Sequence, residues 1–304
     1  MSSIIVTGGS GRLGRSVVRA LAEAGHSVTS IDRSPTPGLP AAQVMVDLTD
    51  SEATRAAFLQ IDSDAVIQLA AIATPFSAPE QQILTTNIAI AWNVIDAAAL
   101  SGVTQVLVAS SPTVIGYGAP TGWRPDYFPL DEQHPTRPWN AYALSKLAIE
   151  RMIDTVIARD GDAVVLGAFR PCFVISPEEW EGAPTQQGHT VLERIDDPES
   201  SAVALFNYVD ARDAADFVVT WIDRSHDVPN GSIFFVGADD ALTREPLSEL
   251  LPRFVPGTEV LAAALTDSTP AFTSAKATRL LGWRPTRSWR TQLRVSERET
   301  ENGL

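Results

Sequence analysis

The sequence predicts an α/β fold built on a doubly wound parallel sheet, with a small mixed C-terminal lobe. Three observations predict it. The chain opens with an apolar run that ends in glycines and is followed by a helical pattern. Short apolar runs then alternate with helical segments up to Pro171. After Pro171 the chain becomes polar and loses its periodicity. Strands that alternate with helices at this spacing form parallel sheets with right-handed crossovers.

The first strand, at residues 4–7, ends in glycines, and an apolar helical pattern follows at 15–24. Glycine lets the diphosphate of a dinucleotide approach the backbone N–H groups at a helix N-terminus, because it has no side chain to block the approach. The turn fits both Gly9-x-Gly11-x-x-Gly14 and Gly8-x-x-Gly11-x-x-Gly14. A purely structural turn is the alternative interpretation. The cofactor-binding residues expected here are Gly8, Gly11, Arg12, Leu13 and Gly14.

The second strand, at residues 27–31, is followed by Asp32, 18 residues after Gly14. A carboxylate at this position accepts hydrogen bonds from the adenosine ribose hydroxyls. We expect NAD as the cofactor, because Asp32 would repel the 2′-phosphate of NADP. Arg33 could attract that phosphate, so NADP stays open.

Further segments extend the predicted sheet. Strands are expected at 43–48, 65–71, 105–111 and 163–170, and helices at 51–59, 87–100 and 140–159. Ligands of such sheets bind beyond the carboxyl ends of the strands. We therefore expect Asp47 and Leu48 at the adenine, and the small residues after the fourth strand to leave space for a flat ring. These residues are Leu69, Ala70 and Ala71.

The chain after Pro171 reads as a substrate lobe. Residues 172–201 are polar and look like a segment inserted over the substrate. A helix ending at residue 222 and a strand at 232–236 then return to the sheet. The tail after Gln292 is expected to be frayed. The predicted division is a dinucleotide-binding domain of residues 1–171 with 203–238, and a substrate-binding lobe of residues 172–202 with 239–304.

Composition excludes several classes of function. The formal net charge of −14 argues against nucleic acid or an anionic membrane as partner, since both require a basic face. No run of 18 apolar residues occurs, and the first strand begins so near Met1 that a cleaved signal has no room. We expect a cytoplasmic protein with a small-molecule partner. With one cysteine and four scattered histidines, neither a disulfide nor a metal site is expected.

The strongest chemical signal is Tyr142 with Lys146, four residues apart at the start of a predicted helix and so on one face. The chain has four tyrosines and only two lysines among its 23 basic residues, so the spacing is not expected by chance. A nearby ammonium favours the phenolate, and we expect the pKa of Tyr142 to fall from about 10 towards neutrality, where it can act as a general acid/base. An exposed helix pair without a chemical role is the alternative.

The chain resembles the extended short-chain dehydrogenase/reductases in a set of motifs that occur in the same order. These motifs are the glycine turn, Asp32, residues 69–71, Asn87, residues 110–116 and the Tyr142/Lys146 pair. The family includes NAD-dependent epimerases and dehydratases of sugar nucleotides. The similarity continues to 208–213, 274–276 and 281–285. It implies a Rossmann-like fold and a homodimer formed through the helices that contain Asn87 and begin at Asn140. It also implies that Ser111, with Ser110 as the alternative, binds the reacting oxygen, that Tyr142 is the acid/base and that Lys146 holds the nicotinamide ribose. Asn87, Pro171 and Cys172 are then expected near the cofactor.

The family leaves the reaction open between oxidoreductase, epimerase and dehydratase. Members that act on nucleotide sugars usually carry an arginine where this chain has residues 204–207, and dehydratases carry an acid where it has Pro112. We therefore expect a dehydrogenase for a sugar, sugar acid or polyol, similar to the uronate dehydrogenases, with a sugar-nucleotide epimerase as the alternative and an inactive NAD(P)H sensor or scaffold as the third reading. Arg170, Trp180 and Arg194 could reach a substrate carboxylate or phosphate. The aromatic loop 118–129 either walls the substrate pocket or packs over the sheet.

Overall fold

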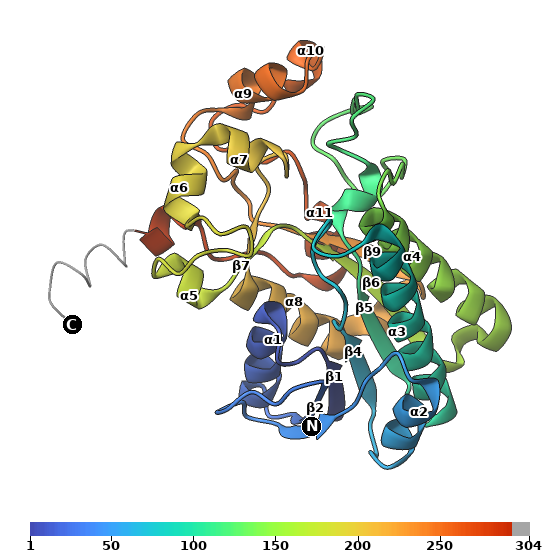
Figure 1. The fold of residues 1–304 in the computed structure, drawn as a ribbon. Helices are drawn as coiled ribbons and strands as arrows, with labels where there is room; N and C mark the ends of the chain where they lie inside the picture. Colours follow the sequence, from blue (N-terminus) through green and yellow to red (C-terminus); the bar gives the residue numbers. More distant parts are fainter. Residues whose placement is uncertain (294–304) are drawn as a thin grey trace, which may run out of the picture.

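The computed structural model describes residues 1–293, and a parallel sheet of seven strands lies at its centre (Figure 1). The strands follow the order β3-β2-β1-β4-β5-β6-β9, and each neighbouring pair is parallel. Their bounds are β1 Ser3–Thr7, β2 Ser27–Asp32, β3 Ala42–Met45, β4 Ala65–Gln68, β5 Gln105–Ala109, β6 Val165–Pro171 and β9 Ser232–Val236. The predicted doubly wound parallel sheet is confirmed.

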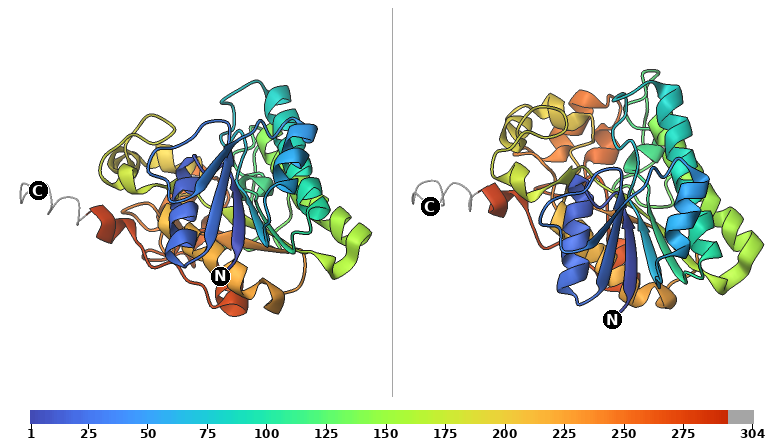
Figure 2. Two further views of the ribbon diagram at one scale, coloured as in Figure 1. Left: turned by 90° about the horizontal axis from the view of Figure 1, so that it is seen from below. Right: turned by 60° about the horizontal axis from the view of Figure 1, so that its bottom comes forward.

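Helices cover both faces of this sheet, as Figures 1 and 2 show. One face carries α1 (Arg12–Glu23) and α8 (Ala211–Arg224), and the other carries α2 (Ser51–Leu59), α3 (Glu80–Leu100) and α4 (Ala141–Asp160). Within β1, Ile4 and Val6 pack in the core under α1, whereas Ile5 packs in the core under α3 and α4. Side chains alternate across a strand, so a strand buried on both faces is continuously apolar, as this one is.

Several predicted boundaries were wrong by a few residues. β3 ends at Met45, β4 at Gln68 and β5 at Ala109, each two or three residues before its predicted end. At the carboxyl edge the chain leaves the sheet but stays next to the hydrophobic core of the sheet. The residues that follow these strands therefore line a cavity instead of pairing with a neighbouring strand. The helix expected from Asn87 begins at Glu80, because its first two turns carry polar residues that the apolar pattern does not register.

A second group of elements lies beyond the carboxyl edge of the sheet (Figure 1). A two-stranded parallel sheet pairs β7 with β8, and a separate buried cluster joins Trp180, Tyr208 and Trp289. The remaining elements are β7 Val174–Ile175, β8 Val209–Asp210, α5 Pro177–Trp180, α6 Val191–Asp196, α7 Pro198–Ala202, α9 Leu247–Phe254, α10 Glu259–Ala262, α11 Ala275–Leu281 and the short 3-10 helices η1 Pro112–Ile115, η2 Gly161–Ala163 and η3 Ser225–Asp227. The division into 1–171 with 203–238 and 172–202 with 239–304 stays a prediction. Beyond Leu293, the predicted frayed tail lies outside the described residues.

One helix among residues 1–293, α3, is long and apolar enough to cross a membrane, with a mean hydropathy of 1.4. Its apolar side chains Ile90, Val94 and Ile95 are buried in the core beside α4. A helix that packs on a sheet face can have the same composition as a membrane span. Of the apolar window of α3, 39% is buried inside the fold.

Candidate active site

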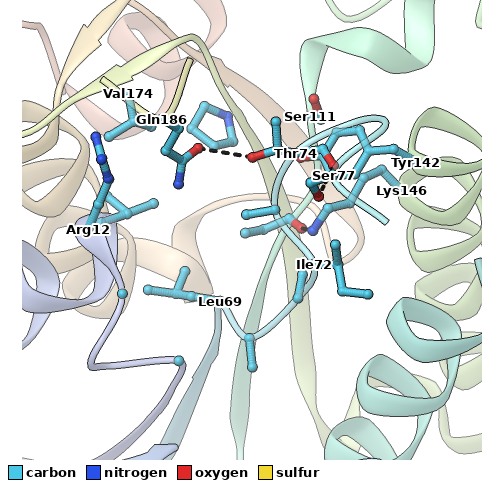
Figure 3. A pocket seen from close by; sticks show the side chains of 18 of the residues that line it. Arg12, Leu69, Ile72, Thr74, Ser77, Ser111, Tyr142, Lys146, Val174 and Gln186 are labelled. Atoms are coloured by element: carbon cyan, nitrogen blue, oxygen red, sulfur yellow. Dashed lines mark hydrogen bonds between the residues drawn. The ribbon is translucent and has the colours of Figure 1, made fainter. Parts of the chain in front are cut away.

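A cavity of about 990 Å³ opens at the carboxyl ends of the central strands, between the glycine turn and the second group of elements (Figure 3). All but one of the residues predicted to be catalytic or to bind the cofactor line it. These residues are Gly8, Gly11, Arg12, Leu13, Gly14, Asp32, Arg33, Asp47, Leu48, Leu69, Ala70, Ala71, Ser111, Tyr142, Lys146, Pro171 and Cys172.

The glycine turn has the shape of a diphosphate cradle. Gly8 has a φ of +74°, and a Cβ on Gly14 would lie 2.1 Å from the Gly8 carbonyl oxygen, so both positions need glycine to close the turn. Gly11 begins α1 without a side-chain cap, which leaves the first N–H groups of that helix without a capping side chain. Uncapped N–H groups at a helix N-terminus fit the diphosphate of NAD.

Asp32 stands beside this turn at the end of β2. Its Oδ2 accepts a hydrogen bond from the Ser10 backbone N–H at 3.1 Å, and its Oδ1 accepts one from the Arg33 backbone N–H at 2.7 Å. These bonds fix the carboxylate at the rim of the cavity, where it can accept the two ribose hydroxyls of NAD. Each oxygen has one backbone donor and keeps a further lone pair, so Asp32 fits the ribose of NAD.

Replacing Asp32 with alanine should shift the cofactor preference towards NADP. We expect NAD to bind about a hundredfold more weakly, because two hydrogen bonds to a charged group are lost. NADP should bind more tightly, because the repulsion ends while the Arg33 cation remains. Titration calorimetry with both cofactors measures the two effects, and Asp32→Ala combined with Arg33→Ala should lose the gain for NADP. Tighter binding of NADP than of NAD by the unaltered chain would contradict this role of Asp32.

The Tyr142 and Lys146 side chains face Ser111 across one wall of the cavity (Figure 3). Asn140 caps α4 by accepting a hydrogen bond from the Ala143 N–H at 2.9 Å, which fixes the start of the helix and with it Tyr142. Lys146 Nζ lies 5.8 Å from the centre of the Tyr142 ring and donates to the Ala109 carbonyl at 2.8 Å. The predicted juxtaposition of phenol and ammonium is therefore present.

The predicted fall of the Tyr142 pKa was wrong for the chain by itself. Burial raises the pKa of Tyr142 to about 12, and a hydrogen bond with Ser111 offsets only part of this. Burial also lowers the pKa of Lys146 to about 8. Both groups have lost their water, and the cost of desolvation outweighs the attraction between the ammonium and a phenolate.

Replacing Lys146 with methionine should change how stability depends on pH. The pKa of Lys146 is about 8 in the folded chain and 10.5 ordinarily, so the unfolded chain binds more protons between these values and stability rises with pH across that window. At about 1.4 kcal/mol per pKa unit, the folded chain is destabilised by roughly 3 kcal/mol below pH 8. At pH 7 the Lys146→Met variant should have a higher free energy of unfolding than the unaltered chain, because it no longer buries this ammonium. The lost hydrogen bond to the Ala109 carbonyl reduces the gain by about 1 kcal/mol. Urea unfolding from pH 7 to 10.5 measures this, and an unaltered pH slope in the variant would contradict it.

The two serines at the end of β5 have different partners. Ser110 Oγ donates to Glu150 Oε1 at 2.6 Å. Ser111 Oγ accepts from the Thr113 hydroxyl at 2.9 Å, caps η1, and lies close enough to Tyr142 to lower the pKa of its phenol. Ser111 is therefore the serine beside the tyrosine, as the resemblance implies.

Two of the three residues considered for substrate binding do not line the cavity. Arg170 is buried and pairs with the Glu150 carboxylate through Nε at 2.8 Å and Nη2 at 2.9 Å. Trp180 is buried and donates its indole N–H to Asp210 at 2.8 Å. Their place in the sequence near the end of β6 could not reveal these partners. Arg194, the third, does line the cavity.

Asn87 is the predicted cofactor residue that lies behind the cavity wall. It is buried, accepts from the Ile72 N–H at 2.8 Å, and donates to the Ile72 carbonyl and to Ser145 Oγ. Ile72 lines the cavity, so Asn87 holds the wall segment in place rather than touching the cavity itself. An asparagine suits this because its amide both donates to and accepts from one backbone.

Sequence reasoning missed much of the cavity at the end opposite to the glycine turn. The missed lining residues are Thr74, Ser77, Gln82, Tyr117, Phe173, Gln186, Gln187 and Asn207. Thr74 and Gln186 meet across the opening at 3.1 Å (Figure 3). The polar run 185–187 within the expected covering segment was a usable signal for the glutamines. Loop 118–129 packs Trp123 and Phe128 against the core and contributes no lining residue, so its packing role is the one observed.

Metal-binding side chains do not gather in the part of the chain that the structure describes. No group of three or more His, Cys, Asp or Glu residues there could hold an ion.

Comparison with known proteins gives consistent results. Residues 4–237 match the model of the NAD dependent epimerase/dehydratase family. The UDP-glucose 4-epimerase of Corynebacterium glutamicum is 25% identical over 93% of this chain and 90% of its own length. A 3 beta-hydroxysteroid dehydrogenase/Delta 5-->4-isomerase of Mycobacterium tuberculosis is 28% identical over 56% of this chain and 46% of its own length.

Solved structures with a similar fold cover almost the whole chain. A UDP-galactose 4-epimerase aligns with a TM-score of 0.67 and 24% identity over 99% of both chains. A short-chain dehydrogenase/reductase superfamily protein from Agrobacterium tumefaciens with bound NAD aligns with a TM-score of 0.71 and 22% identity over 99% of this chain and 100% of that one. At these identities the likeness establishes the fold alone.

Proposed function

The chain belongs to the NAD-dependent epimerase/dehydratase family, and from that premise we propose that it oxidises a secondary hydroxyl of a sugar with NAD as its cofactor. The observation that carries the proposal is the convergence of Ser111, Tyr142 and Lys146 on one wall of a cavity whose other end is a glycine cradle (Figure 3). Such a site brings a hydroxyl-bearing carbon and a dinucleotide together beyond the carboxyl edge of the sheet.

In the proposed mechanism NAD, when bound, supplies the hydride acceptor. Ser111 donates a hydrogen bond to the substrate oxygen, and Tyr142 takes the proton from the same hydroxyl. Because burial raises the pKa of Tyr142 to about 12, the phenolate needs positive charge beside it. Lys146 supplies that charge, and its Nζ can also hold the ribose of the cofactor. The chain therefore contributes position and electrostatic field, and the cofactor contributes the redox step.

The comparisons favour an epimerase over the dehydrogenase that the sequence put first. The relative that covers 93% of this chain is named UDP-glucose 4-epimerase, and several others carry that name. An epimerase returns the hydride to the opposite face of the transient ketone and releases no NADH. The same serine, tyrosine and lysine serve both outcomes, since both begin with oxidation of the hydroxyl.

One observation favours the dehydrogenase as a second candidate. Ala204 lines the cavity in the segment where members that act on nucleotide sugars usually have a diphosphate-binding arginine. A methyl group cannot bind a diphosphate, so a substrate without a nucleotide remains a candidate.

A single incubation separates these outcomes. The protein is mixed with NAD and, in turn, nucleotide sugars, free aldoses, uronates and polyols, while absorbance at 340 nm and sugar composition by NMR are followed. A new stereoisomer without net NADH supports the epimerase, and stoichiometric NADH supports the dehydrogenase. No change with any of these compounds would refute the proposed function. A cytoplasmic location and a homodimer through α3 and α4 remain predictions.

A further inference from the structure

Arg194, on α6, is a buried guanidinium whose charge is not paired within the described chain. Its exposed fraction is 1%, and it lines the cavity. The face of the guanidinium lies 4.1 Å from the centre of the Phe173 ring, and Nη1 donates to Gln187 Oε1. Among residues 1–293, neither Nε nor Nη2 has a hydrogen-bond partner. A buried charged group left without partners costs free energy, so an unfilled edge at a cavity wall calls for a ligand.

Other arginines in the same chain show what this edge binds. Arg170 holds the Glu150 carboxylate side-on, with Nε at 2.8 Å from one oxygen and Nη2 at 2.9 Å from the other. Arg212 holds Asp210 in the same way, at 2.9 and 2.6 Å. In each case the Nε–Nη2 edge forms two parallel hydrogen bonds to a planar carboxylate. Arg194 has the same edge, which is enclosed within the protein and meets no carboxylate of the described chain.

We propose that Arg194 binds a carboxylate of the substrate, so that the enzyme acts on a sugar acid. This inference rests on the proposed function, whose sugar substrate it specifies further. The carboxylate belongs either to a free sugar acid or to the sugar-acid part of a nucleotide sugar, and both give the Nε–Nη2 edge the same planar partner.

The surroundings of Arg194 favour a carboxylate over a phosphate. The side chains nearest to its guanidinium are uncharged amide and aromatic groups, Gln187 and Phe173, with the His189 ring nitrogen 3.3 Å from Nη1. The other cations that line the cavity are Arg12, Arg33 and Lys146, which belong to the proposed cofactor end. A single guanidinium matches the one charge of a carboxylate, whereas a phosphate dianion recruits more than one cation.

Arg194 lines the same cavity as Ser111, Tyr142 and Lys146. Tyr117 lines the cavity, and its hydroxyl lies within electrostatic range of both Tyr142 and Arg194.

Titration calorimetry on the full chain saturated with NADH, which cannot accept a hydride from the sugar, tests the proposal directly. The probes are D-galacturonate, D-galactose, UDP-galacturonate and UDP-galactose, which differ only in the carboxylate and in the nucleotide. We expect the acid to bind about a hundredfold more tightly than its neutral counterpart, the gain of two charge-assisted hydrogen bonds. Arg194→Met should abolish this preference and leave the neutral sugar unaffected. Arg244→Met, which removes an exposed arginine paired with Asp196 on α6, is the matched control and should leave all four affinities unchanged.

The outcomes separate a binding role from a structural one. Removing a buried unpaired charge should leave Tm unchanged or raise it, and Arg194→Lys should recover only part of the preference because an ammonium lacks the fork. Equal affinity of the unaltered chain for acid and neutral sugar would overturn the proposal. An Arg194→Met variant that loses affinity equally for all four probes and has a lowered Tm would also overturn it. The calorimetry does not depend on turnover, so it decides on Arg194 even where the incubation with NAD refutes the proposed reaction.

Discussion

Replacing Tyr142 with phenylalanine should lower turnover about a thousandfold, the middle of the range for a lost general acid/base. The variant keeps the ring that packs at the start of α4 and loses only the hydroxyl that lies near Ser111. NAD affinity should therefore stay within about twofold, since Tyr142 contributes no charge to the proposed cofactor site. Single-turnover formation of NADH or of the epimerised sugar measures the chemical step apart from binding.

Tyr127→Phe is the matched control for this prediction. Tyr127 donates to Asp131 at 2.6 Å in a surface loop and does not line the cavity, so its loss should leave turnover unchanged. A second readout is the pH profile. The alkaline change in turnover of the unaltered enzyme should be absent from the residual activity of Tyr142→Phe. If Tyr142→Phe kept more than about a tenth of the unaltered rate, the proton would be passing through another group.

The fold could be predicted from the sequence because its pattern is local. The apolar run of β1, the glycines after it and the helix α1 each follow from residues adjacent in the chain, and repetition of that unit implies a parallel sheet. The ends of strands could not be predicted. Whether Leu69 or Ser110 stays in the sheet depends on where neighbouring strands stop, and that depends on residues far away in the sequence.

The site divides in the same way. Spacing alone put Tyr142 and Lys146 on one face of α4, and the structure brings both to Ser111. The direction of the Tyr142 pKa could not be read from spacing, because it depends on how much water the assembled fold excludes. For the same reason Arg170 and Arg194 looked equivalent. One is neutralised by Glu150, which comes from another element, and the other has no such partner in the described chain.

The glycine turn carries two separate roles, and two substitutions should separate them. A Cβ on Gly14 would lie 2.1 Å from the Gly8 carbonyl oxygen, which is backbone and cannot turn aside. A Cβ on Gly11 would lie 3.2 Å from the same oxygen, and Gly11 has a φ of −71° that any residue adopts. Gly14 is thus required by the fold of the turn, whereas glycine at position 11 is explained by what approaches the turn.

Gly14→Ala should lower the free energy of unfolding by about 3 kcal/mol, the cost of overpacking against a fixed neighbour. Gly11→Ala should cost less than about 1 kcal/mol, because the contact it makes is only slightly short. Gly11→Ala should nevertheless weaken the binding of NAD roughly a hundredfold, which is equivalent to two charge-assisted hydrogen bonds of about 1.4 kcal/mol each. Urea unfolding and calorimetric titration with NAD measure the two effects. Gly25→Ala is the control. Its φ of +87° makes alanine strained there, but no atom lies within 4 Å of the added Cβ and Gly25 does not line the cavity, so NAD affinity should stay unchanged. Unweakened NAD binding by Gly11→Ala would show that the diphosphate does not rest on the N-terminus of α1.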